Sequence, residues 1–229
     1  MVKRMITPGF YPGVPGSNPG RATERRVESL MSRVRNPIGE RTMHCEKLRG
    51  DAIFVIHDFL SEDECREFIE MSERIGYDEA PITTSFGPQM RKDVRNNTRI
   101  MHDDSDLAMR LYERANPFLV PSWFYRKPIG FNERFRFYRY EAGQRFAPHF
   151  DGRFERDNGE RSEFTFLIYL NNAFTGGETN FFEPERIIVR PEVGLALVFH
   201  HPQLHEGATI ESGVKYVLRT DVMYGSDSD

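Results

Sequence analysis

In the stretch Arg134-Phe135-Arg136-Phe137-Tyr138, phenylalanine recurs at every second residue. A period of two is that of a β-strand, in which successive side chains point to opposite faces. Further strand-like runs follow at residues 164–170, 187–189, 195–199 and 216–224. Turn-forming sequences separate these runs at residues 157–159, 175–177 and 192–194. Short strands at this spacing predict an antiparallel sandwich or barrel over about residues 131–225.

Helices are predicted before this β-rich half, over residues 61–116. Ser61 and Glu64 have the spacing of a capping box, in which two side chains satisfy free N–H groups at a helix start. Gly76 predicts the end of this helix. The apolar residues that share one of its faces are Cys65, Phe68, Ile69 and Ile75. A second helix is predicted at 106–116, so the fold class is α+β, with helices first and the barrel last.

Residues 1–50 are predicted to be a Pro/Gly-rich N-terminal tail or arm. Four prolines and four glycines fall within residues 8–20, a composition that neither helix nor strand tolerates. The folded domain is predicted to span residues 51–229 and to begin with a buried strand at 52–56.

The chain of 229 residues carries a formal charge of −4. This balance argues against a nucleic-acid partner, so we expect a small molecule or another protein. No apolar run approaches the roughly 18–20 residues that span a bilayer, which predicts no membrane partner. Two cysteines, Cys45 and Cys65, are too few for a disulfide framework, and cytoplasmic localisation is the expectation. No feature indicates the oligomeric state.

A metal site is predicted from three residues of the β-rich half. His149 and Asp151 are two apart, so in an extended chain their side chains point to one face. His205 would complete a two-histidine, one-carboxylate triad, the set that leaves iron positions open for an organic co-substrate and dioxygen. A His-x-Asp pair alone is more often a surface turn, and His200 and His201 compete for the third position. Lys215, ten residues after His205, favours His205, because it adds a fixed cation suited to a dicarboxylate.

The residues around this triad carry a resemblance. They are Tyr140-x-x-Gly143-Gln144-x-Phe146-x-x-His149-x-Asp151, Tyr169-Leu170-Asn171, Gly176-Gly177-Glu178-Thr179-x-Phe181, and His205 with Lys215. In this order they resemble the catalytic domain of the prolyl 4-hydroxylase superfamily of 2-oxoglutarate oxygenases, over about residues 50–225. The resemblance implies a double-stranded β-helix, or jelly roll, flanked by N-terminal helices. It also implies Fe(II), with 2-oxoglutarate and O2 as co-substrates and ascorbate as a further candidate.

Carried over to this chain, the resemblance assigns roles to individual residues. His149, Asp151 and His205 would ligate Fe(II), and Lys215 would pair with the C5 carboxylate of 2-oxoglutarate. Two tyrosines, Tyr140 and Tyr169, would form hydrogen bonds near that end of the co-substrate. Ordinary packing inside the barrel is the alternative explanation for both. Arg219 shares a strand face with Lys215, and either a co-substrate contact or an ion pair with Asp221 would explain it.

The substrate is less closely specified. Collagen-type prolyl hydroxylases have an arginine three residues before a strand threonine and a tryptophan six residues beyond the lysine. Here Ser162 holds the first position, with Arg161 displaced by one, and Asp221 holds the second. Candidate substrate residues are Arg161 and the alternating set Arg95, Asn97 and Arg99, which would favour a polar or anionic group. A solvated polar turn is the alternative for the set.

The implied reaction is hydroxylation of a C–H bond with release of succinate and CO2. A prolyl 4-hydroxylase-like activity on a protein or peptide is the main hypothesis. A hydroxylase of a small polar metabolite or free amino acid is the alternative, because the sequence does not distinguish an open peptide groove from a closed pocket. A nucleic-acid dealkylase and a non-enzymatic metal-binding jelly roll are less favoured.

Overall fold

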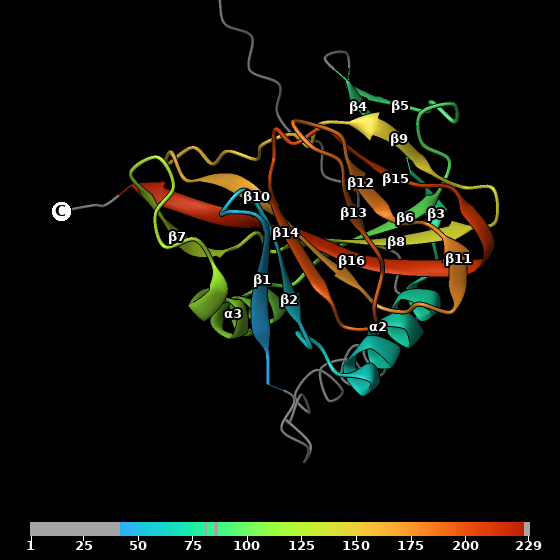
Figure 1. Cartoon of the computed structure of the whole chain (residues 1–229), viewed down its shortest axis with the longest axis horizontal. Helices are drawn as coiled ribbons and strands as arrows, with labels where there is room; N and C mark the ends of the chain where they lie inside the picture. The colour runs from blue at the N-terminus through green and yellow to red at the C-terminus, as the bar shows by residue number, and fades with distance from the viewer. Residues whose placement is uncertain (1–41, 81, 85–86, 227–229) are drawn as a thin grey trace, which may run out of the picture. The chain divides into compact units, whose positions relative to one another are not determined.

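Two antiparallel sheets dominate the computed structural model, which describes residues 42–80, 82–84 and 87–226 (Figure 1). The large sheet has the strand order β1-β2-β14-β10-β16-β8-β6-β3, and β7 and β11 also pair with β16. Its strands are β1 (His44–Arg49), β2 (Ile53–His57), β3 (Asp78–Glu79), β6 (Thr98–Asp103), β7 (Arg126–Phe131), β8 (Arg134–Glu141), β10 (Arg161–Tyr169), β11 (Phe174–Gly176), β14 (Ala196–His200) and β16 (Ile210–Ser226).

The small sheet has the order β13-β12-β15-β9. Its strands are β9 (Phe146–His149), β12 (Thr179–Phe181), β13 (Ile187–Val189) and β15 (His205–Gly207). A separate hairpin joins β4 (Ile82–Thr84) to β5 (Gly87–Gln89).

Helix α2 (Glu62–Ile75) confirms the predicted capping box. The N–H of Glu64 donates to the hydroxyl of Ser61, and the Glu64 carboxylate accepts from the N–H of Ser61. The helix ends before Gly76, which has a φ of +89°. Cys65 and Phe68 are buried as expected, whereas Ile75 is 50% exposed. The prediction was wrong for Ile75 because the buried face of the helix ends at Ser72, before its last residue.

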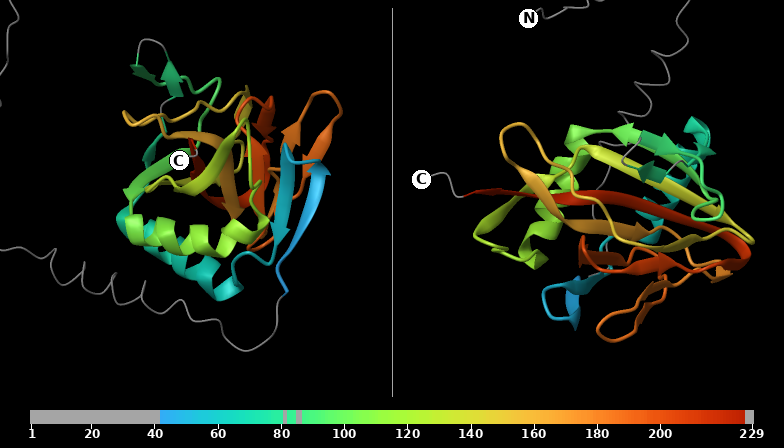
Figure 2. Two further views of the ribbon diagram at one scale, coloured as in Figure 1. Left: turned by 90° about the vertical axis from the view of Figure 1, so that its left-hand side faces the viewer. Right: turned by 90° about the horizontal axis from the view of Figure 1, so that it is seen from above.

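Helix α3 (Ser105–Ala115) confirms the second predicted helix, and a 3-10 turn, η1 (Asn116–Phe118), follows it. The two α-helices lie side by side below the large sheet (Figure 2). Arg114 of α3 joins them by donating to the carboxylate of Glu64 at 2.8 Å. The ring of Phe68 packs 6.2 Å from that of Phe137, so α2 covers the outer face of β8.

The core that surrounds the predicted site lies between the two sheets. Inward-facing residues of the large sheet, such as Tyr138 and Val217, pack with Phe181 and Val189 of the small sheet. Burying a large apolar side chain contributes about 1.5–3 kcal/mol each, so this layer holds the sheets together. The two sheets form the double-stranded β-helix that the sequence predicted, with helices on one side.

Strand β1 is an unpredicted element. It pairs with β2 and precedes residue 51, where the sequence places the start of the folded domain. Its sequence His-Cys-Glu-Lys-Leu-Arg lacks the apolar alternation of a half-buried strand, because it is an edge strand with several exposed positions. The rest of the predicted tail, residues 1–41, lies outside the described residues.

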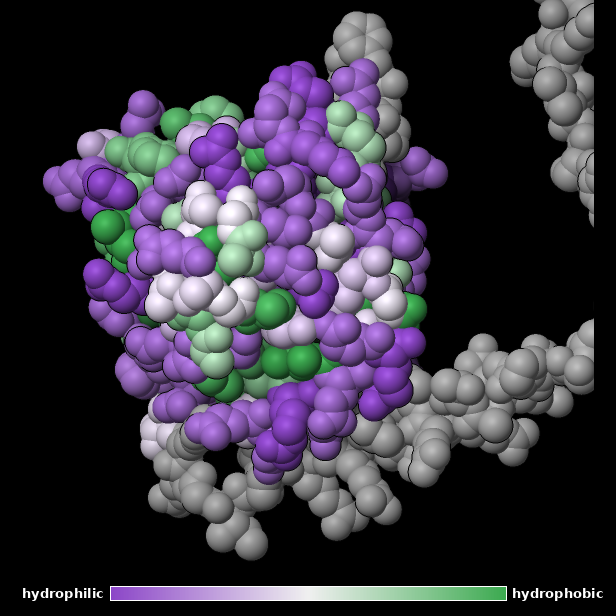
Figure 3. Space-filling view, turned by 90° about the vertical axis from the view of Figure 1, so that its right-hand side faces the viewer, coloured by the Kyte–Doolittle hydropathy of each residue, from purple (hydrophilic) through white to green (hydrophobic). Residues whose placement is uncertain are grey.

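The surface and the helices add two observations. The face of the described part of the chain shown in Figure 3 is largely hydrophilic, with smaller hydrophobic patches among the polar residues. Neither α2 nor α3, the α-helices of the described segments, has the length and apolar composition needed to cross a membrane.

Candidate active site

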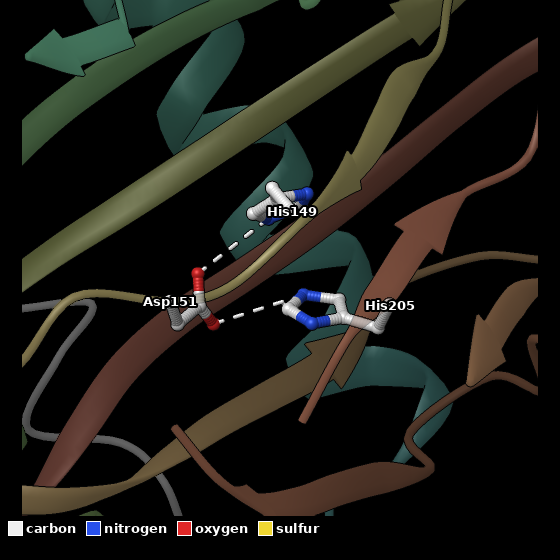
Figure 4. Close-up of side chains that lie close together, drawn as sticks. All are labelled: His149, Asp151 and His205. Atoms are coloured by element: carbon white, nitrogen blue, oxygen red, sulfur yellow. Dashed lines mark ion pairs between the residues drawn. The ribbon is translucent and has the colours of Figure 1, made fainter. Parts of the chain in front are cut away.

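The small sheet brings the three predicted metal ligands together. His149 ends β9 and His205 begins β15, and the two residues are direct partners in the ladder. Asp151 follows two residues after His149 and faces both rings (Figure 4). One ligand atom from each residue lies within 4.8 Å of the others. Within the described segments, this is the one group of at least three such side chains that could hold a metal ion.

The hydrogen bonds of the two histidines leave the right atoms free for a metal. Nδ1 of His149 donates to the carbonyl of Ala147 at 2.8 Å, and Nδ1 of His205 donates to that of Gln203 at 2.9 Å. Both Nε2 atoms therefore carry lone pairs, and they lie 3.6 and 3.8 Å from oxygens of Asp151. Atoms bound to one ion at about 2.1 Å are at most ~4.2 Å apart. The set fits an iron(II) ion, as the two-histidine, one-carboxylate chemistry requires.

The charge state of these ligands also suits a metal. Burial lowers the pKa of His205 to about 4, so its ring is neutral. Burial would raise the pKa of Asp151, but the guanidinium of Arg219 and the neighbouring histidines outweigh it. The pKa of Asp151 is therefore held well below its usual range, and the group is an anionic ligand. Nη1 of Arg219 lies 3.1 Å from its Oδ1.

A chain of hydrogen bonds fixes the other oxygen of Asp151. The hydroxyl of Thr165 donates to Oδ2 at 2.6 Å, so its oxygen must accept from Nδ1 of His201 at 3.1 Å. Nε2 of His201 then accepts from Ser162, whose oxygen accepts from the N–H of Phe154. Burial lowers the pKa of His201 to about 4, in agreement with a neutral ring. Every donor in this series of hydrogen bonds has an acceptor, and the series ends on Asp151, a predicted metal ligand.

The roles of Thr165 and His201 in this chain were not found from sequence. His201 had been set aside as a non-ligand, and its ring nitrogens are indeed engaged elsewhere. Thr165 is the strand threonine of the collagen-type pattern, three residues after Ser162, and that pattern gave it no role at the metal. No local signal could have joined them, because the contact between Thr165 and His201 spans 36 residues.

A cavity connects the triad to the predicted co-substrate residues. It is lined by the three ligands and by Tyr138, Tyr140, Phe146, Leu167, Thr179, Phe199, Gly207, Lys215, Val217 and Arg219. Lys215 is 4% exposed, and its Nζ donates to the carbonyl of Gly177 at 2.5 Å. Burial lowers the pKa of Lys215 to about 7, with Glu178 acting in the opposite direction. A buried amine that no carboxylate of the described residues contacts directly suits the far end of a dianion.

Two tyrosines flank Lys215 as the resemblance implied. Tyr140 is its partner in the ladder and lines the cavity, and burial raises the pKa of Tyr140 to about 12. The Tyr169 ring lies 5.1 Å from Nζ, but its hydroxyl shares a 2.7 Å hydrogen bond with Thr179. Thr179, the first residue of β12, is buried and lines the cavity.

Gly177 explains the glycine pair of the motif. Its φ is +71°, and a Cβ there would lie 2.3 Å from the Ile210 side chain and 3.4 Å from that of Lys215. A larger residue would therefore displace the carbonyl that holds the lysine.

Arg219 forms the ion pair with Asp221 that was one of its two alternatives, and the co-substrate contact stays a prediction. It lines the cavity and pairs with Asp151, and its Nη2 also lies 3.2 Å from Asp221. Asp221 is 1% exposed and accepts from Arg136 as well, at 3.0 Å. Asp221, at the position where collagen-type prolyl hydroxylases have tryptophan, is thus part of a network of charged residues.

The candidate substrate residues have separate surroundings. Arg95 is buried, with its guanidinium over the rings of Tyr138 (4.4 Å) and Phe146 (4.6 Å), and it donates to Asn97 at 2.6 Å. Arg99 is half-buried on β6 opposite Tyr138.

Arg161, the fourth candidate, is engaged elsewhere. It donates at 2.6 Å to Glu163, a fully buried carboxylate that Arg153 shares. An internal ion pair therefore occupies Arg161.

Comparison with known proteins agrees with this geometry. Residues 135–220 match the model of the 2OG-Fe(II) oxygenase superfamily. Over these residues the chain is similar to the oxygenases of that superfamily, and curated proteins that it resembles are prolyl 4-hydroxylases. It is 28% identical over 132 residues to probable prolyl 4-hydroxylase 3 of Arabidopsis thaliana, covering 56% of this chain and 44% of that protein. It is 30% identical over 162 residues to probable prolyl 4-hydroxylase 11, covering 64% and 55%.

The chain thus spans about half the length of these two curated relatives. Among solved structures, the viral collagen prolyl hydroxylase of Paramecium bursaria Chlorella virus-1 superposes with a TM-score of 0.56 at 21% identity. The superposition covers 76% of this chain and 97% of that one. At this identity the likeness concerns the fold. Similarity to the 2OG-Fe(II) oxygenase superfamily implies Fe(II), 2-oxoglutarate and O2.

Proposed function

We propose that this chain is an Fe(II)- and 2-oxoglutarate-dependent dioxygenase that hydroxylates a C–H bond and releases succinate and CO2. Its substrate would be a protein or peptide, by analogy with prolyl 4-hydroxylases. One observation carries the proposal. A two-histidine, one-carboxylate triad and a buried, carboxylate-free lysine line the same cavity.

In this proposal each residue has a defined task. His149, Asp151 and His205 hold Fe(II), which with 2-oxoglutarate and O2 supplies the oxidising chemistry. Lys215 binds the C5 carboxylate, and Tyr140 shields that ion pair from water. Arg219 and Thr165 fix the two oxygens of Asp151, so the carboxylate keeps its orientation while substrate binds.

Succinate release from 2-oxoglutarate tests the assignment. Purified protein with Fe(II) should show the anaerobic charge-transfer absorption of 2-oxoglutarate on iron and slow substrate-independent turnover. Asp151→Ala should lose both, by at least about 10³-fold in turnover, because it removes the only anionic ligand. Asp103→Ala is the control, since Asp103 pairs with Arg134 on an exposed part of β6. Wild-type succinate production by Asp151→Ala would contradict the proposal.

A substrate panel separates the remaining readings. Prolyl peptides, free amino acids and oligonucleotides would be compared by substrate-dependent succinate release, with and without ascorbate. We expect prolyl peptides to stimulate turnover most. Stimulation by a free amino acid alone would favour the small-metabolite hydroxylase, for which the arginines near the cavity are the supporting observation. Cytoplasmic localisation stays part of the proposal, and fractionation of the native protein tests it.

A further inference from the structure

Four guanidinium groups gather where the inner face of the large sheet continues past the metal site; we call Arg95, Arg99, Arg136 and Arg219 the arginine cluster. Across β6, β8 and β16, Arg99 and Tyr138 are neighbours in one row, and Arg136 and Arg219 are neighbours in the next. Tyr138 and Arg219 line the cavity that contains the triad. Arg219 is thus the member of the cluster that lines the cavity, and Arg99 and Arg95 adjoin Tyr138, another of its lining residues.

The carboxylates near the cluster are already committed. Asp151 and Asp221 both pair with Arg219, and Asp221 also accepts from Arg136. Asp78 lies opposite Arg99 in the β3–β6 ladder, but it is exposed and forms no ion pair with Arg99. Arg99 thus has no carboxylate partner among the residues that the structure describes.

This arrangement is electrostatically unfavourable without a further anion. Burial lowers the pKa of Arg99, and the charges of Arg95, Arg136 and Arg219 lower it further, while Tyr138 acts in the opposite direction. Arg95 is 4% exposed, and its Nη2 is buried with no hydrogen-bond partner. A buried guanidinium N–H without an acceptor costs free energy that a bound carboxylate would recover. Planar guanidinium groups match the geometry of a carboxylate.

We propose that Arg99, supported by Arg95, binds a carboxylate of the substrate and so selects acidic substrates. The proposal rests on the dioxygenase function proposed above. The carboxylate has two sources, an acidic side chain near the target residue of a peptide or the α-carboxylate of a free amino acid. It is distinct from 2-oxoglutarate, whose C5 carboxylate the proposal assigns to Lys215, four residues along β16 from Arg219.

A binding test needs no turnover. Arg99→Gln should raise the Tm of the protein by about 2 °C at low ionic strength, because it removes one of four close cations. Replacing chloride by sulfate at matched ionic strength should stabilise the wild type by about 2 °C more than Arg99→Gln. Arg134→Gln is the matched control, a half-exposed arginine of β8 whose partner is Asp103. A lower Tm for Arg99→Gln, or equal sulfate effects, would overturn the anion site.

The source of the carboxylate is tested by succinate release from matched pairs. One set is a capped Gly-rich prolyl peptide with Glu or Gln at each other position; the second is free proline against prolinamide. With Arg99→Gln, the KM for the acidic member of one pair should rise about tenfold or more. The KM for its neutral partner and the KM for 2-oxoglutarate should stay unchanged. An equal rise in KM for both members of the pair would refute substrate recognition by Arg99. If no compound stimulates turnover, the peptide and amino-acid functions fail, while the sulfate result still decides the anion site.

Discussion

The cations at the two ends of the site cavity have opposite surroundings: one is without a contacting carboxylate among the described residues, and the other is paired with two. At one end Lys215 is enclosed by tyrosine rings and a backbone carbonyl, with no carboxylate in contact. At the other end Arg219 is held between Asp151 and Asp221, whose charges raise its pKa against the effect of burial. A cation that is paired inside the protein maintains the structure, whereas one that is left unpaired is available to a ligand. The two ends should therefore respond differently to mutation.

Removing the paired cation should have the largest effect on stability. Arg219→Met leaves Asp151 without its guanidinium and Asp221 with Arg136 alone. Breaking such a buried pair costs about 3–5 kcal/mol, so we expect a large fall in the free energy of unfolding. Urea denaturation measures it, and Arg134→Met, which breaks an exposed pair, should cost under about 1 kcal/mol. Equal losses for the two variants would show that Arg219 is not the main counter-charge.

Removing the unpaired cation should have the opposite effect on stability. Lys215→Met takes away a buried amine that nothing in the described segments neutralises by direct contact, so the free protein should unfold at an equal or higher urea concentration. The same variant should raise the KM for 2-oxoglutarate about 100-fold, since a charge-assisted pair is worth about 1.5–3 kcal/mol. If Lys215→Met destabilised the free protein and left the KM for 2-oxoglutarate unchanged, Lys215 would be a structural residue and not a ligand-binding one.

The hydrogen-bond chain behind Asp151 should have a smaller effect. Thr165→Val removes the hydroxyl that donates to Oδ2 and leaves Nδ1 of His201 without an acceptor. Loss of such a supporting contact weakens metal affinity by about tenfold or more, which a Mn(II) titration measures. Thr220→Val is a matched control, because buried Thr220 donates to the Asn132 carbonyl instead. It should cost similar stability and leave Mn(II) affinity unchanged; equal Mn(II) losses would indicate a general defect.

Strand periodicity explains how much of this could be predicted. The period of two places Lys215 and Arg219 on one face of β16, and it brings His149 and Asp151 close enough to share one metal ion, whose binding stays a prediction. The helices were also predictable, because caps and apolar spacing are local signals.

What escaped prediction depends on contacts that sequence spacing does not record. The pairing of Asp151 with Arg219 joins residues 68 apart, and its strength depends on burial rather than on residue type. Arg161 is a different case, because its partner Glu163 is only two residues away on the same strand; the spacing allows this pair, but it does not show that the carboxylate is fully buried. Strand order, too, follows from how the two sheets share one core.

The pH dependence of co-substrate binding gives the smallest and most specific test. Burial lowers the pKa of Lys215 to about 7 from 10.5 for the unfolded chain, so between these values only the unfolded state holds the proton. For this group, stability of the free protein therefore rises with pH across that window. A bound dianion favours the charged lysine, so its affinity should fall about fivefold from pH 7 to pH 8 as a proton must be taken up.

The other groups that face Lys215 do not obscure this test. The pKa of Tyr140 is raised to about 12 and that of Tyr169 is raised as well, both by burial, so neither ring titrates in the window. Glu178 is the one carboxylate of the described residues that acts on the lysine charge. Calorimetry of 2-oxoglutarate binding with Mn(II), in two buffers of different ionisation enthalpy, measures proton uptake directly. Uptake near one proton at pH 8, absent in Lys215→Arg, would identify this amine as the group; uptake that persists in Lys215→Arg would assign it elsewhere in the site.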